Sequence, residues 1–315
     1  MQQRGLERDQ PCKPRTVLIG TDWWTDCDDV AAMRIFVWAE EQGWIKIAGI
    51  GINACMDYSV ASLDAFLTEE GRPDIAIGLD RQATDFGGNP PYQRNMLNRL
   101  YSRTNDDAED AVSMYRRILA QTEEKLDIIE IGYPQVLSGL LQSPPDRLSG
   151  LTGVELVKQK VDKLWMMAGN WQDNGSGLEN NFARNPRSRA AGHEVCQSWP
   201  TPVTFLGWEI SSEILTGGTL TSPSDMVAQA LRDHGSGNGR SSWDPMLALL
   251  ACCGKEEEAG YRVITGTASV DAETGRNFFE PSPLGSHGYV VKTKQDDYYR
   301  QTIDQILESK QGHSD

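Results

Sequence analysis

Short, continuously apolar segments alternate with longer amphipathic segments along most of this chain. The apolar runs predict β-strands at residues 16–22, 45–53, 74–80, 126–132, 163–169 and 201–210. Apolar residues at helical spacing predict helices between them, at 28–42, 58–70 and 108–124. Strands that are apolar on both faces must be covered on both sides. We therefore expect an α/β fold with a mostly parallel central sheet flanked by helices.

The last third of the chain has a different pattern. Residues 261–275 and 287–294 read as antiparallel strands, and residues 296–309 read as a closing helix. These segments predict a small antiparallel C-terminal extension of the sheet. Because no linker or internal repeat interrupts the pattern, we expect one domain over residues 1–315, with residues 1–14 as a flexible leader.

The charge balance excludes several classes of partner. The chain has 45 acidic and 30 basic residues, a formal net charge of −15. A general nucleic-acid binder needs a basic face, and an anionic membrane surface would be repelled. No apolar run is long enough to span a bilayer. The six cysteines lack a CxxC pair and zinc-like spacing, which favours reduced thiols in a cytoplasmic protein.

Four aspartates lie within eight residues directly after the first predicted strand: Asp22, Asp26, Asp28 and Asp29. In open α/β sheets, ligands bind at the carboxyl ends of the strands. Carboxylates this close repel one another, and a hard divalent cation with oxygen ligands is the natural compensation. The alternative is helix capping, with Asp28 as the N-cap and the others solvated. Capping does not account for Asp22, which ends an apolar strand.

This segment resembles the N-terminal signature of the inosine-uridine-preferring nucleoside hydrolase family, an Asp-rich strand end followed by Asp-Asp at a helix start. Trp24 stands where that family usually has glycine. The resemblance continues in order along the chain, at residues 51–53, 132–135, 167–169, 179–186 and 243–245. It implies a nucleoside hydrolase-like fold.

The resemblance also implies a metal site and a base. Asp22, Asp29, Asp244 and the main-chain carbonyl of Gln135 would hold a calcium ion, although Asp244 could also serve as an N-cap before Pro245. Asp28 would be the general base, taking a proton from a calcium-bound water that attacks the anomeric carbon. Asp26 remains a rival for that role.

The same resemblance assigns the substrate contacts. Four side chains would bind the ribose hydroxyls: Asn53, Asn174, Glu179 and Asn181. Trp243 replaces the family's histidine, which protonates the departing base. A tryptophan can stack on a base but cannot act as that acid. His193, His234 and His287 are the remaining candidates, each more typical of an ordinary surface or core histidine.

Five tryptophans gather near the predicted site, at positions 23, 24, 171, 208 and 243. We expect one of Trp23 and Trp24 to form a pocket wall. Trp208 lies on a predicted strand, so we expect it to pack in the core.

These features predict a hydrolase that cleaves the N-glycosidic bond of a ribonucleoside. We expect a small-molecule substrate and, as in relatives of this type, a homo-oligomer such as a dimer or tetramer. Phosphate-cradling loops and basic residues near the site are not expected, which favours an uncharged nucleoside. Two alternatives remain: a non-catalytic nucleoside- or sugar-binding protein that retains the metal, and a phosphatase-like hydrolase suggested by Asp26-Cys27-Asp28.

Overall fold

The computed structural model describes residues 13–171 and 175–310. Its strands are β1 (Arg15–Thr21), β2 (Ile45–Ile52), β3 (Ile77–Leu79), β4 (Glu109–Asp110), β5 (Leu126–Glu130), β6 (Val161–Met167), β7 (Ser176–Gly177), β8 (Val203–Leu206), β9 (Leu215–Thr216), β10 (Arg240–Ser241), β11 (Tyr261–Val270), β12 (Asn277–Pro281) and β13 (His287–Lys292). The helices are α1 (Asp28–Glu41), α2 (Ser59–Glu69), α3 (Pro91–Met96), α4 (Ala111–Gln121), α5 (Gln135–Gln142), α6 (Gly153–Lys160), α8 (Asn180–Ala183), α9 (Pro186–Ser198), α10 (Trp208–Ser211), α11 (Met226–His234), α12 (Trp243–Cys253) and α13 (Asp296–Ser309).

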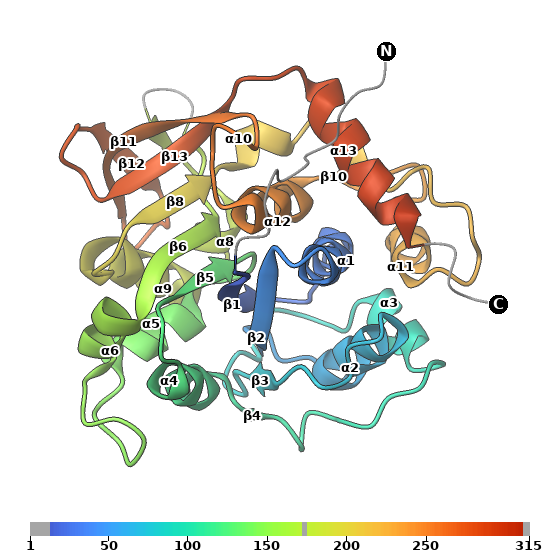
Figure 1. The fold of residues 1–315 in the computed structure, drawn as a ribbon, viewed down its shortest axis with the longest axis horizontal. Helices are drawn as coiled ribbons and strands as arrows, with labels where there is room; N and C mark the ends of the chain where they lie inside the picture. The colour runs from blue at the N-terminus through green and yellow to red at the C-terminus, as the bar shows by residue number, and fades with distance from the viewer. Residues whose placement is uncertain (1–12, 172–174, 311–315) are drawn as a thin grey trace.

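One large sheet dominates the molecule (Figure 1). Its strand order within the described residues is β4-β3-β2-β1-β5-β6-β8-β13-β11-β12-β7. The strands from β4 to β13 in this order pair in parallel, whereas β11, β12 and β7 pair antiparallel. The mostly parallel sheet and its small antiparallel extension are therefore confirmed. The predicted leader falls mainly on residues 1–12, which lie outside the described residues.

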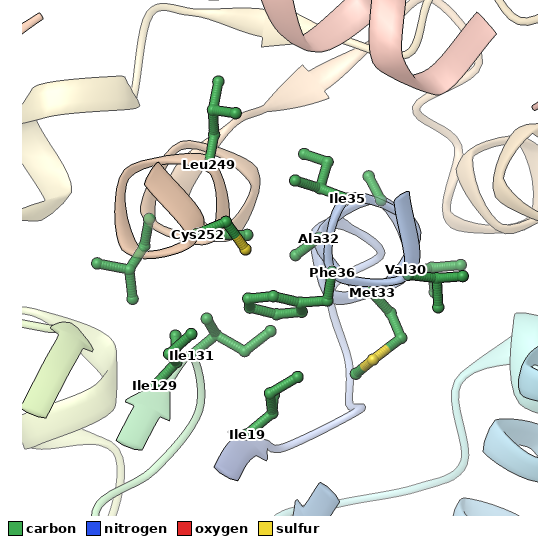
Figure 2. Close-up of a cluster of buried hydrophobic side chains, with 14 of the residues drawn as sticks. Ile19, Val30, Ala32, Met33, Ile35, Phe36, Ile129, Ile131, Leu249 and Cys252 are labelled. Atoms are coloured by element: carbon green, nitrogen blue, oxygen red, sulfur yellow. The ribbon is translucent and has the colours of Figure 1, made fainter. Parts of the chain in front are cut away.

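Helices cover both faces of the sheet, because the central strands are apolar on both sides. Along β1, Val17 and Ile19 belong to the core that packs against α1 and α12, whereas Leu18 belongs to the core beneath α4, α5 and α9. Figure 2 shows Phe36 of α1 between α12 and the side chains of Ile129 and Ile131. This packing places the first turns of α1 and α12 beside the carboxyl end of β1.

Some predicted boundaries differ from the structure. The strand predicted over 201–210 ends at Leu206, because its neighbour β6 pairs no further than Met167 opposite Leu206. Trp208 instead begins the short helix α10 and is 42% exposed, so the prediction that it packs in the core is wrong. The loop that follows β3 ends where α3 begins, at Pro91. None of the described helices is long and apolar enough to cross a membrane.

Candidate functional site

A cavity of about 290 Å³ lies where the chain order of the sheet reverses, beside the carboxyl ends of β1, β5 and β6. From β1, the chain builds the sheet outward through β2 and β3 before crossing back to β5 on the other side. Neighbouring loops diverge at such a point and leave a crevice for a ligand. The lining residues are Asp22, Trp24, Thr25, Asp26, Asp28, Asp29, Ile131, Tyr133, Met167, Glu179, Asn180, Asn181, Arg184, Trp208, Arg240, Trp243 and Asp244.

Four buried aspartates from distant parts of the chain meet in this cavity. Carboxylate oxygens of Asp28, Asp29 and Asp244 all lie within 4.8 Å of one another. Asp22 lines the same wall, interacts with the carboxyl group of Asp29, and accepts a hydrogen bond from the Trp24 amide at 3.0 Å. The structure thus brings together three predicted metal ligands and the predicted base.

Helix geometry holds these carboxylates in place. Asp28 and Asp29 open α1, whose N-cap is Cys27, and Asp244 lies in the first turn of α12, whose N-cap is Ser242. The Asp28 carboxylate accepts a hydrogen bond from the Asp244 amide at 3.2 Å. The capping alternatives for Asp28 and Asp244 are therefore wrong. Each instead benefits from the positive end of a helix dipole.

The aspartate cluster carries more negative charge than its surroundings balance. Burial raises the pKa of Asp22, Asp28 and Asp244 well above the ordinary range, and it raises that of Asp29 to about 7. Coulombic repulsion among the neighbouring aspartates adds to this effect at Asp22, Asp28 and Asp244. Within the described part of the chain, no Lys or Arg forms an ion pair with any of the four. This set of buried oxygen donors fits a hard divalent cation.

Asp26 has a different environment from the cluster. It accepts hydrogen bonds from Arg240 Nε at 2.9 Å and Arg240 Nη2 at 2.5 Å, and His234 Nε2 lies 3.8 Å away. Burial acts to raise the pKa of Asp26, but the hydrogen bonds and charge of Arg240 outweigh it and lower that pKa. A carboxylate held in this ion pair is a poor proton acceptor, which favours Asp28 as the base.

The two tryptophans in the turn between β1 and α1 lie in different environments. Trp23 is the one described non-glycine residue with positive φ (50°); its side chain is fully buried and donates to Ser62 Oγ at 2.9 Å. Its amide donates to Thr21 and Asp29 in a conformation that is strained for a large side chain. Trp24 then lines the cavity, so the expected pocket wall is Trp24.

The opposite wall comes from the segment around α8. Glu179 is the N-cap of α8 and accepts hydrogen bonds from the amides of Asn181 at 2.7 Å and Gly169 at 2.9 Å. Burial raises the pKa of Glu179 to about 7. Asn181 donates to the Met167 carbonyl at 2.9 Å, and Asn180 donates to the Tyr133 hydroxyl at 3.0 Å. Asn180 and Tyr133 were not predicted as site residues, although both lie within the segments that resemble the nucleoside hydrolase family.

Not every predicted contact reaches the cavity. Asn53 is fully buried and does not line it: its amide nitrogen donates to Glu130 at 2.8 Å, and its oxygen accepts from the Tyr133 amide at 2.9 Å. The Gln135 side chain does not line it either, and its buried amide has no hydrogen-bond partner among the residues that the structure describes. Asn174 lies outside the described residues. In this structure Asn53 supports the loop that carries Tyr133, rather than facing a ligand.

Glu130 is a buried carboxylate that accepts a hydrogen bond from Asn53, below the cavity. Its Oε1 accepts hydrogen bonds from Asn53 and the Gly132 amide, while its Oε2 is buried without a partner. Position 20 must be glycine, because a side chain there would overlap this carboxylate. Burial raises the pKa of Glu130 from 4.5 to about 8.

We expect the free energy of unfolding to depend less on pH in the variant Glu130→Gln than in the parent protein. Between the two pKa values the folded protein retains a proton that the unfolded chain releases. Stability is therefore full below the unfolded pKa and falls as the pH rises toward 8. Glutamine keeps the acceptor oxygen without ionising, so the variant should gain on the order of 2–3 kcal/mol relative to the parent between about pH 5 and about pH 8. Urea unfolding of metal-free protein at both pH values measures this. Parallel pH profiles for the two proteins would contradict the prediction.

Aromatic rings form the remaining wall of the cavity. Trp243 donates its indole N–H to the Trp208 carbonyl at 3.0 Å, so that proton is already used within the protein. The described histidines do not line the cavity: His193 bonds the Val270 carbonyl, His287 accepts from the Ala268 amide, and His234 lies beside Asp26. Trp243 and Trp208 therefore offer ring surface to a ligand, while the described histidines offer it no proton.

Two arginines contradict the expectation that basic residues are absent from the site. Arg240 lies on β10, which pairs with β9, and it forms an ion pair with Asp26. Arg184 lies directly after α8. Both line the cavity. Neither arginine is adjacent to an aspartate in sequence, so neither was predicted; Arg184 does lie within the segment 179–186 that resembles the nucleoside hydrolase family.

The buried carboxylates lie at the switch point of an open α/β sheet, where sheets of this class bind ligands. No protein-family profile matches the sequence, and no curated protein resembles it significantly. Solved structures do resemble it. An inosine-uridine-preferring nucleoside hydrolase from Bacillus anthracis superposes with a TM-score of 0.65 at 14% identity, over 93% of this chain and 99% of that one.

Two further structures agree with this result. A purine-preferring ribonucleoside hydrolase from Gardnerella vaginalis gives a TM-score of 0.67 at 16% identity, over 94% of this chain and 100% of that one. The type III effector protein XopQ, solved with adenosine diphosphate ribose, gives 0.65 at 14% identity over 95% of each chain. The resemblance inferred from the sequence is thus confirmed at the level of fold: this chain has a divergent nucleoside hydrolase fold.

Proposed function

We propose that this protein is a metal-dependent hydrolase that cleaves the N-glycosidic bond of a ribonucleoside. The observation that carries the proposal is the meeting of residues 22–29 with Asp244 in one buried acidic cluster, opposite Glu179 and Asn181, in a single cavity. This combination places groups that could hold a cation and groups that could bind hydroxyls in the same cavity, which a sugar-cleaving site requires.

Asp22, Asp29 and Asp244 would hold the metal, with the main-chain carbonyl of Gln135 as a further ligand. We propose calcium, because all these donors are oxygens and calcium accepts about six to eight of them. When bound, the cation offsets the repulsion between the carboxylates and polarises the oxygens that it contacts. The raised pKa values in the cluster support a site that is completed by positive charge.

Asp28 would act as the general base. Its carboxylate is buried in the cluster and accepts a hydrogen bond from the Asp244 amide, and burial raises its pKa, which makes it a stronger proton acceptor than an exposed aspartate. It would take the proton of the attacking water as the bond to the base breaks. Positive charge then develops on the ribose ring, and the carboxylates of Glu179 and the aspartate cluster stabilise it.

The leaving base would lie between Trp243 and Trp208. Because the described histidines do not line the cavity, departure of the base should depend weakly on protonation by the protein. Stacking on the half-buried ring of Trp243 and the exposed ring of Trp208 would orient the base. We therefore expect the best substrates to be nucleosides whose base already leaves readily, such as guanosine methylated at N7.

Release of free base from a panel of nucleosides tests this function. The panel should contain inosine, uridine, adenosine and N7-methylated guanosine, each with excess calcium and with a chelator. We expect base release with calcium, strong loss with chelator, and the fastest turnover on the methylated nucleoside. No release from any nucleoside with calcium present would reject the proposal.

The rival function is a nucleoside- or sugar-binding protein without turnover. Trp243 in place of a proton-donating residue favours it, and one structural neighbour was solved with adenosine diphosphate ribose. Calorimetric binding of the same panel separates the two, because tight binding without base release would support the binder. The phosphatase alternative is weakened by the ion pair that holds Asp26 against Arg240.

A further inference from the structure

Arg184 is a cation at the cavity wall without a carboxylate partner among the described residues. It is exposed, it lines the cavity, and its guanidinium lies 5.0 Å from the centre of the Trp24 ring. One of its nitrogens, Nη2, donates to the Phe86 carbonyl at 3.1 Å. Stacked in this way, the guanidinium is held in position while most of its N–H groups remain available.

Its neighbours do not share this property. Arg240, on the other side of the cavity, is held by Asp26 in a bidentate ion pair. Arg187, three residues further along the chain, pairs with Asp80 at 2.9 Å and lies 3.7 Å from Asp85. In a chain with net charge −15, a pocket arginine without an acidic partner is a site for an external anion.

The position of Arg184 indicates which part of a ligand it meets. The residue follows α8 directly, and its amide bonds the Asn180 carbonyl at 2.9 Å. The two proposed ribose contacts belong to the same short helix: Glu179 is its N-cap and Asn181 lies in its first turn. The aromatic wall of Trp208 and Trp243, proposed for the base, comes from α10 and α12 instead. Arg184, which pairs with no carboxylate in the described part of the chain, is therefore placed with the proposed ribose contacts rather than with the proposed base contacts.

We propose that Arg184 binds a phosphate group on the ribose, so that the preferred ligand is a ribose 5-phosphate unit rather than an unphosphorylated ribose. Guanidinium N–H groups match phosphate oxygens in pairs, and the contacts with the Trp24 ring and the Phe86 carbonyl hold the Arg184 guanidinium at the cavity wall. The inference rests on the proposed function in one respect, the placement of the sugar beside Glu179 and Asn181. Phosphate recognition itself does not require turnover.

Titration calorimetry with ribose 5-phosphate and with ribose, both in excess calcium, tests the proposal without chemistry. For the parent protein we expect tighter binding of ribose 5-phosphate, and for Arg184→Gln we expect a loss of roughly 10- to 100-fold in that affinity. The affinity for ribose itself should be unchanged. A variant that retains the parent's affinity for ribose 5-phosphate would overturn the proposal, as would a parent that binds both sugars equally.

Arg187→Gln is the matched control. Arg187 anchors the same 80–86 segment that Arg184 touches through Phe86, but it does not line the cavity. Its partly exposed ion pairs contribute little, so both affinities should stay within about twofold of the parent's. An equal loss in Arg187→Gln would assign the effect to the loop and overturn the proposal. If base release fails while Arg184 still discriminates the phosphate, only the hydrolase function is rejected.

Discussion

Replacing Asp28 with asparagine is expected to reduce base release by about a thousandfold or more, because the variant loses its proton acceptor while keeping the shape of the cluster. Asp28 lies among the other carboxylates and receives the Asp244 amide, and an asparagine oxygen can still accept that bond. Single-turnover and steady-state rates on the best nucleoside measure the loss. Calcium affinity, followed by calorimetry, should change far less than turnover.

Asp26→Asn is the control for this prediction, since it removes a carboxylate from the same turn. Asp26 is already paired with Arg240, so we expect its loss to reduce turnover by at most about tenfold, through a less ordered wall at Arg240. If Asp26→Asn and Asp28→Asn were to lose turnover equally, the assignment of the base would be wrong. If Asp28→Asn lost calcium and turnover together, Asp28 would be a ligand instead.

Asp244→Asn is expected to abolish the thermal stabilisation by calcium. A ligand that binds only the folded state raises its melting temperature, and Asp244 supplies one of the cluster's buried oxygens. Without metal, the substitution should stabilise the folded protein instead of destabilising it. Burial and the neighbouring aspartates raise the pKa of Asp244, so its ionised form destabilises the metal-free fold as the pH rises.

The metal-free variant should therefore be more stable than the metal-free parent at about pH 8, with the difference fading toward about pH 4. Melting curves with calcium and with chelator, at both pH values, measure this crossover. Asp297→Asn is the matched control, because Asp297 also lies in the first turn of a helix, α13, but is exposed and pairs with Arg300 outside the cavity. A calcium response in Asp244→Asn equal to the parent's would contradict the proposed ligand set.

Much of the fold follows from local pattern. Apolar runs without polar alternation can only be strands covered on both faces, and β1, β2, β5, β6 and β8 all form where such runs occur. The predicted strand over 201–210 was too long, because a strand ends where its neighbour does, and the end of β6 is not visible in the sequence of β8. Residues within one turn, such as Asp28 and Asp29 at the start of α1, were likewise placed correctly by sequence.

By itself, the sequence determined the α/β architecture and an acidic turn at the end of β1, since both depend on residues that are neighbours in the chain. Only the tertiary structure decided that Arg240 pairs with Asp26, that Asn53 bonds to Glu130, and that Arg184 lines the cavity without a carboxylate partner among residues 13–171 and 175–310. Each of these outcomes depends on which of several competing partners lies within about 3 Å after packing. Separation along the chain does not encode that distance, because helices and strands between the partners decide it.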